Sequence, residues 1–229
     1  MSTENTTQNF EASIEKIYQQ YRHRQLANQL DEIAETIEET ILQQILAEEF
    51  LETELEIDSE AKKAVSEAQE LLKNGDFETL GERLADVEAK VEDQKRQISN
   101  EIHEVRISMR SRVKGIMRLN ERVERVSKVK LEAIRELLSD WDWKGQVYRE
   151  EEYDFETLKE RAAEYGEDMR RYFEECREQI FGPYEGTPME PIVDRLLSDD
   201  RLSLDELSDE QIVQLRESDL VDHVELTLS

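Results

Sequence analysis

The chain has few of the residues that end helices or cross-link loops: its 229 residues include one cysteine, three prolines and seven glycines. With Cys176 as the single cysteine, no intramolecular disulfide can form, which fits a reducing cytoplasm. All three prolines lie beyond residue 182. Because tight turns need glycine and proline, this shortage favours long helices joined by few breaks.

Apolar residues are also scarce, at 37% of the chain, and aromatic residues make up 7%. Ordinary globular domains contain about 45–50% apolar residues, so a compact core of normal size is not expected. No apolar run approaches the roughly 20 residues that cross a bilayer. Residues 1–9 lack the basic and apolar regions of a signal peptide. The sequence therefore predicts a soluble, cytoplasmic protein without a membrane partner.

Residue patterns that carry catalysis or bind cofactors are missing from the sequence. His23, His103 and His223 lie far apart, and one cysteine cannot supply a multi-thiolate zinc site. There is no glycine-rich phosphate loop, no paired Glu-x-x-His motif and no nucleophile elbow. Cys176 falls on an apolar seam, as a packed side chain does. We therefore expect a non-enzymatic protein with no catalytic, cofactor-binding or metal-binding residues.

Acidic residues far outnumber basic ones: 57 Asp and Glu oppose 30 Lys and Arg, which gives a net charge of −27. The acid extends from one end of the chain to the other, and only 11 of the 30 basic residues are lysines. Sparse lysine with abundant acid resembles proteins of halophilic archaea; a mesophilic acidic protein is the alternative. In a halophile the net charge reports on habitat and solubility rather than on function.

Apolar residues recur every three or four positions over most of the chain, which is the spacing of an amphipathic helix. The spacing predicts helices over about residues 10–55, 60–73, 77–138 and 155–181, after a disordered N-terminus of residues 1–9. The third helix would be a rod of roughly 93 Å, which only another long helix can cover. We therefore expect an all-α fold, an elongated coiled coil of long antiparallel helices.

Helix ends and interruptions can also be located. Ser59 is the expected N-cap of the second helix, and Asn74-Gly75 its stop. Asp76 and Asp154 are placed to cap the third and fourth helices. In the first helix Ile17, Tyr21, Leu26 and Leu30 share one predicted apolar face. In the third, Gln94 interrupts the apolar seam, and the spacing from Ile98 to Val105 shifts its register as a heptad stutter does.

Residues 187–229 form a small C-terminal module in this interpretation, because Gly182-Pro183 and Gly186-Thr187-Pro188 break the chain before it. Ser203 with Glu206, and Ser208 with Gln211, match the capping-box pattern of helix starts. Residues 223–228 alternate apolar and polar side chains, as a strand does. We expect this strand to pair with residues 201–204 or with another chain. A net charge of −9 over the module argues against DNA contact there.

One segment reverses the charge of the chain: residues 106–130 contain nine Arg and Lys against two Glu, a net charge of +7. Seven of these, which we call the basic stripe, lie opposite the apolar seam of the predicted third helix. They are Arg106, Arg110, Lys114, Arg118, Arg122, Arg125 and Lys128. Arg112 and Lys130 flank the seam itself. A one-sided basic surface in so acidic a chain predicts contact with an acidic partner.

Three acidic partners fit the basic stripe. The first is the chain's own helix 155–181, whose Glu164, Glu175 and other acids would lie beside it if that helix folds back antiparallel. The second is nucleic-acid phosphate, although no aromatic residues interleave with the basic ones for base stacking. The third is an acidic site on another protein, including a second copy of this chain.

Trp141 and Trp143 directly follow the third predicted helix. They either anchor the end of the rod against a neighbouring helix or form a hot spot for a partner.

These features together predict a scaffold or adaptor that acts by protein–protein interaction in a halophilic, archaeal-type cytoplasm. It would self-associate as a homo-oligomer or join an unidentified assembly partner. The alternative is a DNA-associated architectural factor, or an accessory subunit of a coiled-coil ATPase of chromosome maintenance, that contacts phosphates through the basic stripe.

Overall fold

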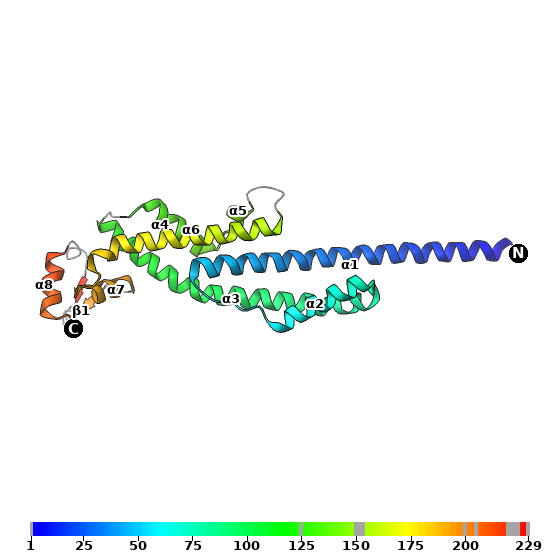
Figure 1. Ribbon diagram of the computed structural model, residues 1–229, viewed down its shortest axis with the longest axis horizontal. Coiled ribbons are helices and arrows are strands. Elements are labelled where there is room, and N and C mark those ends of the chain that lie inside the picture. Colours follow the sequence, from blue (N-terminus) through cyan, green and yellow to red (C-terminus); the bar gives the residue numbers. More distant parts are fainter. Residues whose placement is uncertain are drawn as a thin grey trace. The chain divides into compact units, whose positions relative to one another are not determined.

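A computed structural model describes residues 2–123, 126–148, 154–198, 201–203, 206–218 and 225–227. Within these ranges, side chains are described except at residues 2–15, 19, 121–123, 196–198, 201–202 and 225–227. The fold is all-α apart from two short strands, as predicted (Figure 1). The elements are α1 (Ser2–Leu51), α2 (Ser59–Asn74), α3 (Phe77–Val123), α4 (Lys128–Asp140), α5 (Lys144–Val147), α6 (Phe155–Phe181), η1 (Gly182–Tyr184), α7 (Glu190–Ser198), β1 (Arg201–Ser203), α8 (Asp209–Glu217) and β2 (Glu225–Thr227).

The chain forms two compact units. The first unit consists of Met1–Ile41 and Leu55–Asn100, and the second of Leu42–Glu54 and Glu101–Ser229. Helix α1 begins at Ser2, so the expected disordered N-terminus of residues 1–9 is wrong from Ser2 onward. Extending an existing helix adds one hydrogen bond for each residue ordered, which explains how a polar segment continues it.

In the first unit, α1 and α3 run parallel, and α2 packs antiparallel to both (Figure 1). The ring centroids of His23 and Phe77 lie 4.7 Å apart near the start of α3, and Lys95 pairs with Glu39 at 3.4 Å further along both helices. The shared core consists of small and aliphatic side chains: Leu26, Ile33, Ala64, Ala68, Leu80, Leu84, Val87 and Val91. Consecutive helices are antiparallel as expected, whereas α1 and α3 are parallel because α2 separates them in sequence.

The turn between α2 and α3 is formed as the sequence predicts. Gly75 ends α2 with a φ of 71°, in the left-handed region that glycine adopts without strain. The Asp76 carboxylate then accepts a hydrogen bond from the Thr79 N–H at 3.2 Å and caps α3. At the other end of α2 the N-cap is Asp58 rather than Ser59, because the Asp58 carboxylate accepts from the Glu60 N–H at 3.1 Å.

Gln94, which interrupts the apolar seam, is 5% exposed and holds the connector between α1 and α2, residues 52–58. Its Oε1 accepts from the Asp58 N–H at 2.6 Å, and its Nε2 donates to the Glu56 carbonyl at 3.2 Å. Both halves of the buried amide are therefore satisfied by a non-helical segment of backbone. The polar residue in the seam has a structural role that periodicity alone does not reveal.

The predicted rod of residues 77–138 is wrong beyond Val123. Helix α3 ends there, and α4 begins at Lys128 and runs back along it. Contacts at both ends establish this hairpin: Asn120 hydrogen-bonds Val126, and Arg106 donates to the Ser139 carbonyl at 3.3 Å. The buried Asn120 amide provides a partner for the turning backbone, which takes the place of the helical hydrogen bonds lost at the break.

The core of the second unit forms where the end of α1, the C-terminal part of α3, α4 and α6 pack together. Its buried side chains include Leu42, Leu46, Phe50, Ile102, Val113, Ile116, Leu131, Ile134, Leu138, Leu158, Met169 and Phe173. Helix α6 is capped by Asp154, as predicted, and passes close to α1 at Gly166. A Cβ at Gly166 would lie 2.7 Å from the Cβ of Glu49, so no larger residue fits without movement.

Residues 187–229 belong to the second unit rather than forming a unit of their own. Strands β1 and β2 pair in parallel, with Leu202 opposite Leu226, so the predicted pairing with residues 201–204 is confirmed. The Ser208–Gln211 capping box is present at the start of α8. In the other predicted box, Ser203 is the last residue of β1 and Glu206 pairs with Arg195, and residues 204–205 between them lie outside the described residues.

Candidate interaction surfaces

The α3–α4 hairpin divides the basic stripe between two helices. Arg106, Arg110, Lys114 and Arg118 lie on α3, and Lys128 is the first residue of α4. The Arg122 side chain and all of Arg125 lie outside the described residues. The sequence predicted that the basic stripe forms one face of an unbroken helix. The hairpin shows that this prediction is wrong.

Arg106 is engaged within the second unit. Its guanidinium donates to the Ser139 carbonyl at 3.3 Å and lies 5.8 Å from the centroid of the Trp141 ring. Burial lowers the pKa of Arg106, and the charge of nearby Arg110 lowers it further. These contacts connect α3 to the end of α4, so Arg106 stabilises the α3–α4 hairpin.

The two basic residues that flank the seam contact α6. Lys130 forms an ion pair with Glu175, and its ammonium also lies 4.9 Å from the centroid of the Tyr172 ring. Arg112 lies 5.7 Å from the centroid of the Phe173 ring. Helix α6 thus runs antiparallel to α4 (Figure 1). The intramolecular interpretation placed it antiparallel to one unbroken helix that carries the whole basic stripe, so the structure matches that arrangement for α4 alone.

Three members of the basic stripe remain exposed: Arg110, Lys114 and Lys128. None of them forms an ion pair with a residue that the structure describes. Arg118 is partly buried and has interactions of its own. Of the five stripe side chains that the structure describes, three are therefore open to an acidic partner.

Trp141 and Trp143 are buried, at 8% and 2% exposure. Trp141 ends α4 in a left-handed conformation, with a φ of 53°, and its backbone N–H donates to the Leu137 carbonyl at 2.8 Å. The Trp143 and Tyr148 ring centroids lie 6.0 Å apart. Burial of both indole rings favours the anchor interpretation over an exposed hot spot.

The second unit also contains the one cysteine, Cys176, on the buried side of α6. Burial raises the pKa of the Cys176 thiol to about 11, so the thiol is protonated and shielded near neutral pH. Among the residues that the structure describes, no three His, Cys, Asp or Glu side chains gather as a metal site.

Two features of the first unit escaped the sequence analysis, and the first is the outer part of α1. Among the α1 side chains that the structure describes, Arg22 and His23 are the first with a contact to α3, and residues 2–21 continue beyond them as a helix of about 30 Å. Figure 1 shows this blue end of α1 running on past α2 and α3. On it Ile17, Tyr18 and Tyr21 are 62–69% exposed.

These exposed side chains do not belong to the face of α1 that packs in the core. At about 100° per residue, Ile17, Tyr18 and Tyr21 centre on a direction about 145° away from that of Leu26, Leu30, Ile33 and Ile37. The apolar spacing predicted that Ile17, Tyr21 and Leu26 share a single apolar face, and this prediction is wrong. We call Ile17, Tyr18 and Tyr21 the outer face of α1. A helical wheel of residues 17–37 separates the outer face from the packed face.

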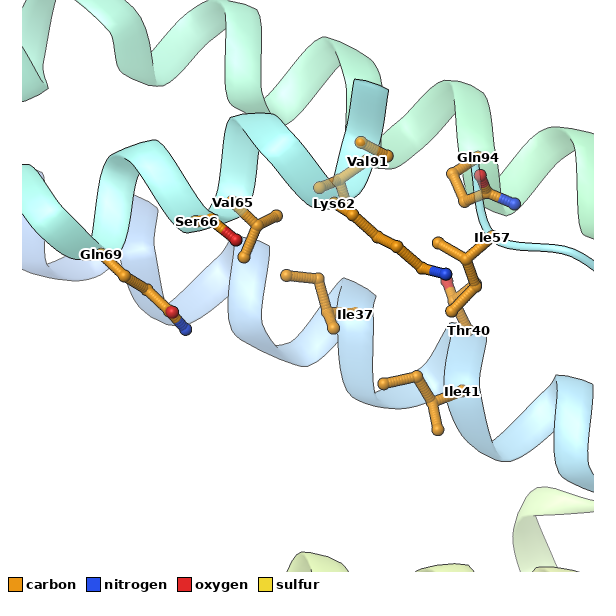
Figure 2. Close-up of a pocket in the computed structure, with 11 residues that line it drawn as sticks. Ile37, Thr40, Ile41, Ile57, Lys62, Val65, Ser66, Gln69, Val91 and Gln94 are labelled. Atoms are coloured by element: carbon orange, nitrogen blue, oxygen red, sulfur yellow. The ribbon is translucent and has the colours of Figure 1, made fainter. Parts of the chain in front are cut away.

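The second feature is a cavity of about 420 Å³ between α1, α2, α3 and the connector (Figure 2). Its apolar lining is Ile37, Ile41, Ile57, Ala61, Val65 and Val91, and its polar lining is Thr40, Lys62, Ser66, Gln69 and Gln94. The volume is at the lower end of the roughly 300–1,000 Å³ of small-molecule sites. The sequence signal for this site is Gln94, the polar residue in the apolar seam, because its hydrogen bonds bring the connector against α3.

Comparison with protein-family models, with curated proteins and with solved structures finds no match to this chain. Among the described residues, no helix combines the length and the apolar content that a membrane crossing needs.

Proposed function

We propose that this protein is a non-enzymatic helical scaffold that self-associates through the outer face of α1, in a halophilic, archaeal-type cytoplasm. The observation that carries the proposal is the exposure of Ile17, Tyr18 and Tyr21 on a helix that continues beyond the helices of its own unit. An isolated helix of this length is marginal in water, so packing against another helix would stabilise it. Contiguous exposed apolar side chains are typical of protein–protein contacts.

The charge pattern around the outer face favours a second copy as the partner, in antiparallel orientation. Residues 1–15 contain three acidic and no Lys or Arg residues, whereas residues 16–24 contain three Lys or Arg and no acidic residues. An antiparallel pair whose midpoint lies near residue 14 would place the acidic stretch of each copy beside the basic stretch of the other, with Arg24 opposite Glu4. A parallel pair would place like charges together, which opposes pairing.

Size-exclusion chromatography with light scattering tests the association. It is run at about 0.1 M and about 1 M salt, where screening of charges is weak and strong. The double variant Ile17→Glu/Tyr21→Glu places charge on the outer face, and we expect it to shift the mass towards that of a monomer. Gln20→Glu is the matched control, since Gln20 is exposed and lies on another side of the helix. A wild-type chain that is monomeric at every concentration and salt would overturn the proposal.

The orientation has a separate test at low salt. Reversing two basic residues, in Arg22→Glu/Arg24→Glu, would place acid beside acid in an antiparallel pair, and we expect weaker association. In a parallel pair the same change replaces one like-charge contact by another and leaves association unchanged. Unchanged association would therefore contradict the antiparallel arrangement while leaving self-association intact.

A second candidate function is contact with nucleic-acid phosphates, as a DNA-associated architectural factor or an accessory subunit of a coiled-coil chromosome-maintenance ATPase. It is favoured by the exposure of Arg110, Lys114 and Lys128 in a chain of net charge −27. The test is binding to a DNA duplex across a salt series, with Arg110→Glu/Lys114→Glu against Lys63→Glu as control. Phosphate contact predicts selective loss in the first variant and a steep decrease with salt. No binding at any salt would end this proposal.

A further inference from the structure

The cavity in the first unit has an apolar interior that the chain itself leaves uncovered. Ala61 and Val91 are buried at its base, whereas Ile37, Ile41 and Val65 are only half-buried. Aliphatic side chains that line a hollow gain free energy when an apolar group replaces the water against them, by about 25 cal/mol per Å². An occupant with an aliphatic part therefore fits the interior.

The buried polar groups of the cavity are already committed to the protein. The Thr40 hydroxyl donates to the Thr36 carbonyl at 2.7 Å. The Gln94 amide uses its oxygen for Asp58 and its nitrogen for Glu56. Neither group is therefore the main recognition point for the polar part of a ligand.

Lys62 is the one charged residue among those that line the cavity, all of which the structure describes. Figure 2 shows its side chain extending from α2 towards Ile57 and Thr40, which brings the ammonium to the rim. No residue of the described part of the chain forms an ion pair with it. The adjacent Lys63 does pair, with Glu67 at 3.9 Å. An exposed ammonium left without a carboxylate beside an apolar hollow is complementary to an anionic head on an aliphatic chain.

We propose that this cavity binds a medium-chain alkyl carboxylate. The hydrocarbon tail would lie on Ile37, Ile41 and Val65, and the carboxylate would accept hydrogen bonds from the Lys62 ammonium at the rim. A tail of about ten carbons suits a site at the small end of the ligand-pocket range. Cationic amphiphiles are disfavoured by Lys62, and small inorganic anions lack the tail that the interior requires.

Isothermal titration calorimetry of the full chain tests the head group, with decanoate, decanol and decylamine below their aggregation concentrations. We expect decanoate to bind most tightly and decylamine least. Lys62→Gln should weaken decanoate binding by about tenfold, the scale of a charged hydrogen bond, and should leave decanol unaffected. Lys63→Gln is the matched control, since it removes the same charge one position along the same helix and should change neither affinity.

A second variant tests the place of the tail. Ser66 is exposed at the rim, so Ser66→Trp can cover the opening without disturbing the core, and we expect it to weaken decanoate and decanol alike. Absence of decanoate binding to the wild-type chain would overturn the proposal. Equal affinity of decanoate and decanol with no effect of Lys62→Gln would also overturn it. A third outcome would overturn it as well: the wild-type chain binds no ligand, and Ser66→Trp loses self-association. That result would show that a second copy occupies the cavity.

Discussion

The side-chain amide of Asn120 and the backbone of Val126 are joined by two hydrogen bonds. The Val126 N–H donates to Asn120 Oδ1 at 2.7 Å, and Asn120 Nδ2 donates to the Val126 carbonyl at 3.0 Å. Asn120 is 2% exposed, so water cannot replace these partners. The pair is the described contact that joins the end of α3 to the segment leading into α4.

Replacing Asn120 by alanine should destabilise the second unit. The change leaves the Val126 N–H and carbonyl without their partner in a buried turn, and we expect a loss of about 2–4 kcal/mol in the free energy of unfolding. Urea unfolding followed by circular dichroism measures it. Ser111→Ala is the control, because it removes an exposed hydrogen bond to the Ile107 carbonyl and should cost about 0.5 kcal/mol or less. Equal effects of the two variants would contradict the role assigned to Asn120.

Gly166→Ala should also destabilise the second unit, through overpacking between α6 and α1. The new Cβ would lie 2.7 Å from Glu49 Cβ and 3.0 Å from the Leu46 carbonyl oxygen, so the helices must move apart. We expect a loss of about 1–3 kcal/mol in thermal or urea unfolding. Gly145→Ala has nothing within 4 Å of its added Cβ and lies in α5. It should be neutral or stabilising by up to about 1 kcal/mol.

The Lys130–Glu175 pair should make stability depend on pH at both extremes. The hydrogen bond from Lys130 lowers the pKa of Glu175 below its usual 4.5, and the same bond raises the pKa of Lys130 above its usual 10.5. The Glu175 contribution is present above pH 4.5 and is lost as the pH falls through its lowered pKa. The Lys130 contribution is present below pH 10.5 and is lost as the pH rises through its raised pKa.

A thermodynamic cycle over Lys130→Gln, Glu175→Gln and the double variant isolates this pair. We expect both single variants to lose the pH-dependent component, and the double variant to lose little more than either. Charge exchange in Lys130→Glu/Glu175→Lys should restore part of the pairing. Strictly additive single-variant effects at neutral pH would show that the pair does not couple α4 to α6.

Cys176 should be inert in the folded protein and should destabilise it in alkali. Burial raises its pKa from 9.0 to about 11, so the folded state holds the thiol proton more tightly than the unfolded state. The contribution of Cys176 to stability is then constant below about pH 9 and decreases as the pH rises towards 11. A thiol reagent at pH 8 should react only after urea unfolding. Rapid reaction of the native protein, or an unchanged alkaline decrease in Cys176→Ala, would contradict this.

Local rules located most helix ends because each end depends on a few neighbouring residues. Asp76, Asp154 and the Ser208–Gln211 box were readable in this way, and Gly75 supplied its left-handed turn. The β1–β2 pairing was also anticipated, since alternating apolar residues at the C-terminus needed a partner nearby.

The α3–α4 break was not predicted because it contains no helix breaker, and its N-cap residue, Ser127, makes no capping hydrogen bond through its side chain. Residues 124–127 include no Gly or Pro, and the apolar spacing continues from α3 into α4. The break depends on the buried contact between Asn120 and Val126, which the apolar spacing does not indicate, and on the packing of α4 against α6, which no window of local sequence contains. The position of the basic stripe was mispredicted for the same reason. It was placed on one straight helix, whereas the α3–α4 hairpin divides it between two helices.

Gln94 determines which alignment of α3 the first unit can adopt. Aliphatic seams repeat, so a helix displaced by one heptad, about 10.5 Å, meets similar side chains and loses little packing. A displaced α3 would instead bury an amide with no backbone to bond, and would leave the Asp58 N–H and Glu56 carbonyl without Gln94. One polar residue in the seam thereby acts as a register lock, which disfavours the slipped structures that apolar seams tolerate.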